Sequence, residues 1–221
     1  MIPPLQTNFY GRVRNLMNKL EVKNITKYYG PKCVLSNVSI SVKENETIAI
    51  LGQNGCGKTT LFRLIAGLER PDSGQIFIDG KDVTNTPGQV SYMQQNALLF
   101  PHKTVLENVT LPLILSNWNK ESAEGYAQKF FSEFFISGTE NKYPHELSGG
   151  MRQRVAFLRT YLQDKDILVL DEPFSALDSI SKTSMYAWCL NVIKRFKTTT
   201  LLVTHDIDEA LLLANTIYVL S

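Results

Sequence analysis

"LGQNGCGKTT" (Leu51–Thr60) contains the phosphate-binding pattern G-x-x-x-x-G-K-[ST], which runs from Gly52 to Thr59. The apolar run Thr47–Ile50 precedes it and predicts a buried strand. A helical pattern follows it, carried by Leu61, Leu64 and Ile65. Glycines leave backbone N–H groups free to converge on phosphate oxygens, and the N-terminus of the next helix adds a favourable dipole. The order of strand, loop and helix therefore predicts a site for the phosphates of a nucleotide.

Two side chains of this loop carry chemistry of their own. Lys58 can reach the β- and γ-phosphates, and the hydroxyl of Thr59 can ligate Mg²⁺. We expect the other loop residues to bind the nucleotide as well: Gly52, Gln53, Asn54, Gly55, Cys56, Gly57 and Thr60. A glycine-rich turn with a chance lysine is the alternative, but it leaves the flanking strand and helix unexplained.

A second motif, "ILVLDEPFSALD" (residues 167–178), supplies acidic groups. Asp171 ends an apolar run, at the point where ligands bind in open α/β sheets, and it can hold Mg²⁺ through the water shell of the ion. Glu172 can orient or deprotonate an attacking water. An Asp-Glu pair after an apolar run is common by itself. Together with the phosphate loop it indicates nucleotide hydrolysis.

Length and composition limit the class of protein. The chain has 221 residues, 43% of them hydrophobic, and a formal net charge of +2, which predicts one sizeable core and no basic field for nucleic acid. Its three cysteines, Cys33, Cys56 and Cys189, form no CxxC pair, which favours a reducing compartment. No apolar run reaches the roughly 18 residues that a membrane span needs.

The order of the elements predicts an α/β fold. Residues 19–50 are β-rich, and short apolar strands are expected at residues 90–93, 167–170, 201–204 and 217–220. Helical patterns fill residues 122–135 and 151–162, and the first of them puts Phe131, Phe134 and Phe135 on one apolar stripe. We expect a core with a mainly parallel sheet, an N-terminal antiparallel β subdomain, and a helical subdomain inserted at about residues 96–163. Residues 1–16 are expected to form a weakly ordered extension before a single domain, residues 17–221.

"LSGGMRQR" (Leu147–Arg154) carries the resemblance to a known family. Together with the two motifs above it resembles the ATP-binding cassette of ABC transporters, a P-loop NTPase, from about residue 19 to the C-terminus. Ser148, Gly149 and Gly150 precede a predicted helix, so they form a second anion site. In the family this site faces the γ-phosphate of ATP held by a partner cassette.

The resemblance assigns further residues one by one. Tyr29 matches the aromatic residue that stacks on adenine, and Gln95 matches the glutamine that completes the Mg²⁺ and water shell. His205 matches the histidine that contacts the γ-phosphate, and Asp178 matches the residue that links two cassettes. The implied catalytic residues are Glu172, His205, Lys58 and Gln95, and the implied metal ligands are Thr59, Gln95 and Asp171.

The resemblance implies an ATPase subunit that works with ATP and Mg²⁺ at the cytoplasmic face of the membrane. The expected partners are a second copy of the chain, permease subunits and, indirectly, an extracytoplasmic solute-binding protein, with no nucleic acid. The sequence looks most like bacterial importers of the nitrate, sulfonate, taurine and thiamine-precursor group. A soluble ABC ATPase that acts on ribosomes or DNA and a non-catalytic regulatory cassette are the alternatives.

One segment is expected to touch the permease. "NALLFPHKTVLENV" (Asn96–Val109) is apolar for a loop, through Leu98, Leu99, Phe100 and Val105. Because exposed apolar patches mark partners, we expect it to line a groove for a short permease helix.

Overall fold

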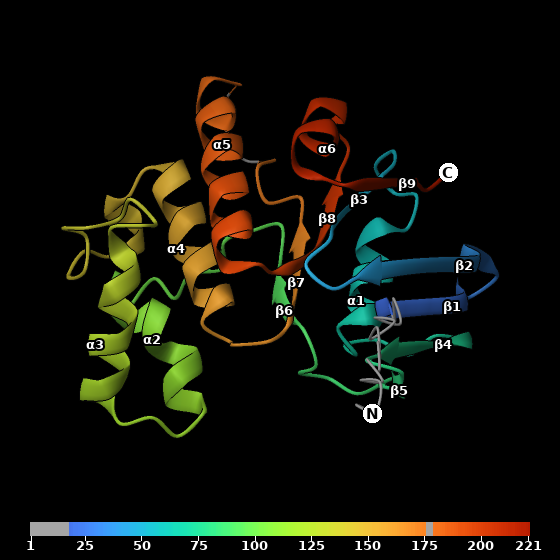
Figure 1. The fold of residues 1–221 in the computed structure, drawn as a ribbon, viewed down its shortest axis with the longest axis horizontal. Coiled ribbons are helices and arrows are strands. Elements are labelled where there is room, and N and C mark those ends of the chain that lie inside the picture. The colour runs from blue at the N-terminus through green and yellow to red at the C-terminus, as the bar shows by residue number, and fades with distance from the viewer. Residues whose placement is uncertain (1–17, 176–178) are drawn as a thin grey trace, which may run out of the picture.

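The computed structural model describes residues 18–175 and 179–221, and Figure 1 shows their arrangement. The expected extension 1–16 and Asp178 therefore lie outside the described residues. An antiparallel sheet of four strands, in the order β2-β1-β4-β5, forms the N-terminal part. Its strands are β1 (Asn18–Tyr29), β2 (Lys32–Lys43), β4 (Ser73–Ile78) and β5 (Lys81–Asp82). The prediction of an antiparallel β region near the N-terminus is confirmed.

A second sheet of five strands is parallel throughout and has the order β6-β7-β8-β3-β9. Its strands are β6 (Ser91–Met93), β7 (Ile167–Asp171), β8 (Thr199–Thr204), β3 (Thr47–Leu51) and β9 (Thr216–Val219). Helix α1 (Lys58–Ile65) follows β3, and α6 (Ile207–Leu213) follows β8. Since the strands are parallel, their carboxyl ends meet at one edge, which brings the phosphate loop, residues 171–172 and His205 together.

Helices fill the chain between β6 and β7 and lie on the far side of the parallel sheet from the antiparallel sheet (Figure 1). They are α2 (Val105–Leu115), α3 (Lys120–Phe131), the 3₁₀ turn η1 (Pro144–Glu146) and α4 (Gly149–Tyr161), and α5 (Ser179–Phe196) comes after β7. A continuous apolar core joins these helices to one face of the parallel sheet, and it includes Val109, Phe131, Phe157, Leu170 and Trp188.

Two local expectations were wrong. The helical pattern to residue 135 ends earlier, because α3 stops at Phe131, and Phe135 adopts a left-handed backbone (φ 51°) with its side chain exposed. Val105 does not line a surface groove. It is the first residue of α2, whose start is fixed by a capping box between Thr104 and Glu107, and its side chain is buried.

Across the described residues, no helix is at once long enough and apolar enough to cross a membrane.

Candidate functional site: the nucleotide cavity

The phosphate loop has a shape that only glycine permits at its two ends. Gly57 caps α1 with φ 105°, and a Cβ atom there would lie 2.9 Å from the carbonyl oxygen of Val34. A Cβ atom on Gly52 would lie 2.5 Å from the carbonyl oxygen of Leu220. Both positions therefore need glycine, and the loop is held tightly between β3 and α1.

Lys58 is folded back under this loop. Its side chain is 4% exposed, and its Nζ donates to the carbonyl oxygens of Gly52 at 2.8 Å and Gln53 at 2.9 Å. The same Nζ lies 3.7 Å from Oε1 of Glu172. The ammonium is thus held at the centre of the loop and beside the carboxylate at the end of β7.

Asp171 is buried behind the loop and accepts two hydrogen bonds. Thr59 Oγ1 donates to its Oδ1 at 3.3 Å, and the hydroxyl of Tyr92 donates to its Oδ2 at 3.0 Å. Burial raises the pKa of Asp171 above its ordinary value, and the two hydrogen bonds oppose that shift. A hydroxyl and a carboxylate at this spacing are the hard oxygen donors that Mg²⁺ prefers, so the residues present fit that ion.

Sequence reasoning missed Tyr92. Burial raises the pKa of its phenol, and the charge of Asp171 raises it further, so the hydroxyl remains a donor. The strand pairing explains its position, because Tyr92 lies opposite Val169 in the parallel pair β6–β7. The one sequence feature that could have pointed to Tyr92 is its position on the short predicted strand that leads to Gln95.

Glu172 is the point at which the predicted side chains meet. Its backbone is left-handed (φ 45°), and its N–H donates to the carbonyl oxygen of Val203 at 3.0 Å, so β8 holds the turn. Nε2 of Gln95 donates to Oε2 of Glu172 at 3.1 Å, and Nδ1 of His205 lies 3.4 Å from the same oxygen. A strained backbone at a residue with three polar neighbours is typical of a functional site.

A cavity of about 430 Å³ opens beside these residues. It is lined by Tyr29, Val34, Asn54, Gly55, Gly57, Lys58, Thr59, Thr60, Gln95 and Glu172. The half-exposed ring of Tyr29 borders it from the antiparallel sheet, and the Tyr29 hydroxyl donates to the Glu69 carboxylate. The structure thus brings an aromatic ring, the phosphate loop and Glu172 around one space.

The signature residues Ser148, Gly149 and Gly150 are not among those that line this cavity. Ser148 instead caps α4, and its Oγ accepts from the N–H of Met151 at 3.3 Å. The helix N-terminus at Ser148 is therefore separate from the phosphate loop of the same chain.

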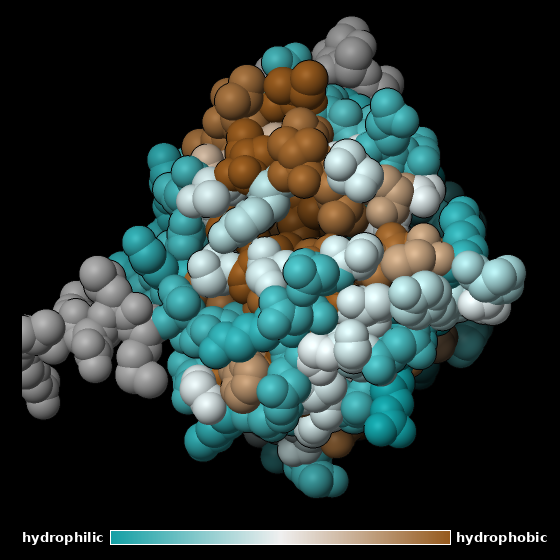
Figure 2. All heavy atoms as spheres, turned by 90° about the vertical axis from the view of Figure 1, so that its right-hand side faces the viewer, coloured by the Kyte–Doolittle hydropathy of each residue, from teal (hydrophilic) through white to brown (hydrophobic). Residues whose placement is uncertain are grey.

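The outer side of the phosphate loop borders a second, more apolar cavity of about 650 Å³. The side chains of Cys56 and His205 line it, together with residues of β9 and the chain end. Figure 2 shows apolar side chains gathered on this face of the molecule, where Ile207, Leu211, Leu212 and Val219 are exposed. Cys56 thus lies on the other side of the loop from the space that Lys58 and Tyr29 border.

Fold and site together define a P-loop nucleoside triphosphatase. The profile of the family described as "ABC transporter" matches residues 35–175, more than half of the chain. The chain belongs to the ABC transporter family.

Relatives with known descriptions agree with this assignment. The formylaminopyrimidine import ATP-binding protein ThiZ of Halalkalibacterium halodurans is 48% identical over 192 residues, which cover 87% of this chain and 75% of that protein. The spermidine/putrescine import ATP-binding protein PotA of Chromobacterium violaceum is 40% identical over 208 residues. Those residues cover 93% of this chain but only 58% of PotA, so this chain matches little more than half of the length of that relative.

Solved structures give the same result. The dimeric structure of MJ0796, a bacterial ABC transporter cassette, has a TM-score of 0.80 and 30% identity, covering 91% of this chain and 94% of that one. A post-hydrolysis state of the same cassette, bound to ADP and Pi, has a TM-score of 0.79.

Proposed function

We propose that this chain is the ATP-hydrolysing subunit of an ABC importer. The observation that carries the proposal is the meeting of Lys58, Gln95 and His205 at the carboxylate of Glu172, which lines the cavity that Tyr29 borders. The relatives named above are import ATP-binding proteins, so they give no support to the alternative of a ribosome- or DNA-directed ATPase.

Each side chain then has a role in hydrolysis. Glu172 orients the attacking water and accepts its proton, while Lys58 holds the β- and γ-phosphates in place. Thr59, Asp171 and Gln95 would hold Mg²⁺, which neutralises charge on the phosphates when it is bound. His205 contacts the γ-phosphate, and the ring of Tyr29 stacks on adenine.

The signature loop completes the site of a second copy. Ser148, Gly149 and Gly150 lie at the N-terminus of α4, apart from the cavity of their own chain, and so they suit the γ-phosphate of ATP bound by a partner. Two copies related by a two-fold axis would make two such sites, with Asp178 at the contact between them. The dimeric form of MJ0796 supports this arrangement.

The permease would dock beside the segment that follows Gln95. Leu98 is 55% exposed and Phe100 is 40% exposed, whereas Leu99 packs partly against the helical core. Arg159 of α4 fixes this segment, because its guanidinium donates to the carbonyl oxygens of Ala97 and Leu98, each at 2.9 Å. The segment is therefore linked to α4 by these hydrogen bonds and to Gln95 through the chain.

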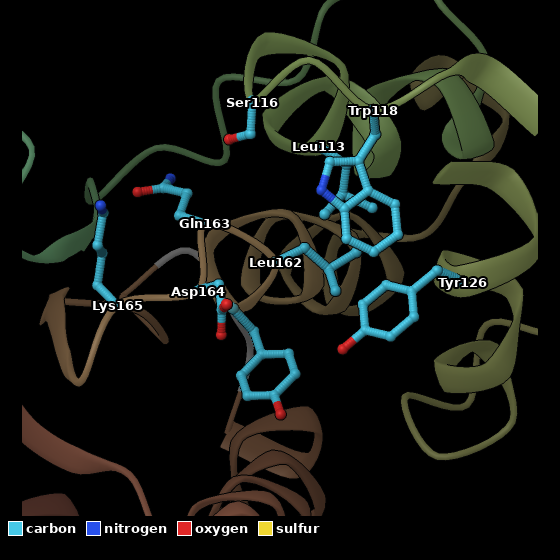
Figure 3. Close-up of a pocket in the computed structure, with 9 residues that line it drawn as sticks. Leu113, Ser116, Trp118, Tyr126, Leu162, Gln163, Asp164 and Lys165 are labelled. Atoms are coloured by element: carbon cyan, nitrogen blue, oxygen red, sulfur yellow. The ribbon is translucent and has the colours of Figure 1, made fainter. Parts of the chain in front are cut away.

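A hollow of about 250 Å³ lies at the end of α4 and is a second candidate contact for the permease. Figure 3 shows the rings of Trp118 and Tyr126 on one side of it and Ser116, Gln163 and Lys165 on the other, with Leu162 between them. Aromatic rings with a polar rim suit an amphipathic helix of a partner, and we assign the surface to a cytoplasmic segment of the permease. This placement puts the chain at the cytoplasmic face of the membrane.

The test is reconstitution with the permease encoded nearest to this chain. We expect ATP hydrolysis and solute uptake into vesicles, and loss of both with Lys58→Ala. Lys120→Ala is the matched control, because the Lys120 side chain is 76% exposed on α3. Hydrolysis that survives Lys58→Ala would contradict the proposed site. The solute itself is chosen by the partner subunits, and organic solutes of the thiamine-precursor kind are the first to try.

A further inference from the structure

Glu209 is a buried acidic residue that none of the motifs includes. It lies on α6, is 3% exposed, and its Oε2 accepts a hydrogen bond from Oγ1 of Thr204 at 2.9 Å. Among the described residues, its Oε1 has no hydrogen-bond partner. Burying a carboxylate is costly, so its retention here calls for a specific role.

The hydrogen bond from Thr204 sets the direction of a short chain of contacts. A hydroxyl has one proton, so when Thr204 donates to Glu209 its lone pairs face elsewhere, and Oγ1 accepts from the backbone N–H of Asp206 at 2.9 Å. The carboxylate of Asp206 in turn accepts from the backbone N–H of Glu209 at 3.3 Å. The contacts close a ring through Thr204, Asp206 and Glu209.

His205 lies between the first two members of this ring. Its half-exposed side chain has one polar partner within the part of the chain that the structure describes, Oε2 of Glu172. A side chain held by a single contact depends on its backbone for its position. That backbone is fixed on one side by Thr204 and on the other by Asp206.

The ring is also tied to α5. Asp206 Oδ2 lies 3.5 Å from Nζ of Lys182 and accepts from the hydroxyl of Tyr186 at 3.3 Å. Helix α5 therefore contacts, through Asp206, the turn that carries His205. The ring is fixed from two helices, α5 and α6.

We infer that Glu209 is a positioning residue for His205, acting through the hydroxyl of Thr204. This inference rests on the proposed role of His205 in ATP hydrolysis. Glu209 does not touch the nucleotide cavity, so its loss should lower kcat and leave KM for ATP almost unchanged. A residue that only fills space would be replaced by an apolar side chain of similar size without loss of activity.

The experiment compares four single variants and one double variant in the reconstituted complex, with His205→Ala as the reference. Glu209→Leu keeps volume but removes the acceptor, and we expect kcat to fall about tenfold with KM within twofold of the parent value. Thr204→Val replaces only the hydroxyl, by a methyl group, and should lower kcat by the same factor. The kcat of the double variant should be no lower than that of either single variant. Glu209→Gln keeps an acceptor oxygen and Thr204→Ser keeps the hydroxyl, so both should retain kcat.

The outcomes separate this inference from the proposed function. If His205→Ala is inactive while Thr204→Val keeps parental kcat, the positioning role is wrong and the function of His205 stands. If His205→Ala itself is fully active, the proposed function fails at that residue. Equal losses in Glu209→Gln and Glu209→Leu would overturn the role of the hydrogen bond. Thr204→Val changes one buried atom, so it keeps the test valid even if Glu209→Leu does not fold.

Discussion

Nε2 of Gln95 donates a hydrogen bond to Oε2 of Glu172 at 3.1 Å, and thereby joins the surface of the molecule to the carboxylate that we propose as the catalytic base. Gln95 is exposed and lies three residues before the exposed Leu98. A partner that binds this segment would therefore lie close to the hydrogen-bond donor of the residue that we propose activates water. We propose that this contact couples the permease to ATP hydrolysis.

The first prediction concerns Glu172 itself. Glu172→Gln keeps the shape and hydrogen bonds of the side chain but removes the base, so turnover should fall by about 10²-fold or more. ATP should still bind, because Lys58 and the loop glycines are unchanged. Steady-state hydrolysis and binding of a fluorescent ATP analogue measure the two effects. Glu121→Gln, on the exposed face of α3, should behave as the parent chain. Near-parental turnover would move the catalytic role to another residue, with His205 the first to examine.

The second prediction concerns the permease contact. Leu98→Asp combined with Phe100→Asp places two charges on the exposed apolar segment, which should abolish copurification with the permease. Binding of ATP to the isolated subunit should persist, because neither side chain lines the nucleotide cavity. Leu211→Asp is the control, since Leu211 is even more exposed than Leu98 and Phe100 but lies on α6. Intact assembly of the double variant would place the docking surface elsewhere.

The residues that sequence predicted best are those in short contiguous motifs. Lys58, Glu172 and His205 each follow a strand of the parallel sheet, so the fold class alone predicts that they meet at one edge. Tyr92 and Glu209 carry no such signature. Tyr92 meets Asp171 across 79 positions of sequence, which local patterns do not encode.

The end of α3 shows a second limit of sequence patterns. The apolar spacing continues to Phe135, but the left-handed backbone of that residue takes it out of the helix. Tertiary packing decided this boundary, since Phe134 is fully buried in contact with the rings of Phe157 and Trp188. Periodicity gives the existence of such a helix more reliably than its last turn.

The third prediction concerns stability and pH. Burial raises the pKa of Glu209 from 4.5 to about 7. The negative charges of Asp206 and Glu172 raise this pKa further, whereas the hydrogen bond from Thr204 and the charge of Lys182 lower it. The folded chain therefore keeps a proton that the unfolded chain releases above pH 4.5, and the free energy of unfolding should fall as pH rises from about 4.5 to 7. The shift corresponds to a loss on the order of 3 kcal/mol. Glu209→Gln cannot titrate, so its denaturant midpoint should fall less over that range. Parallel pH profiles for the two proteins would contradict the assignment.

The last prediction concerns the composite site. Ser148–Gly150 lie outside the cavity formed by Lys58 and Glu172 of the same chain, so we expect each ATP to be bound by the signature loop of another copy as well. The nucleotide is then part of the interface, and a variant that binds ATP without hydrolysing it should accumulate as a dimer. Glu172→Gln should therefore pass from monomer to dimer on size-exclusion chromatography when Mg-ATP is added. The same variant carrying Lys58→Ala should remain monomeric because it holds no phosphates.

Gly149→Asp in the Glu172→Gln chain should also remain monomeric while still binding ATP, because its negative charge repels the γ-phosphate of the partner's nucleotide. That last variant separates loss of ATP binding from loss of dimer formation. Two outcomes would show that the two anion sites do not meet across copies of this chain. One is a dimer that forms despite Gly149→Asp. The other is a Glu172→Gln chain that stays monomeric at saturating Mg-ATP with its permease present.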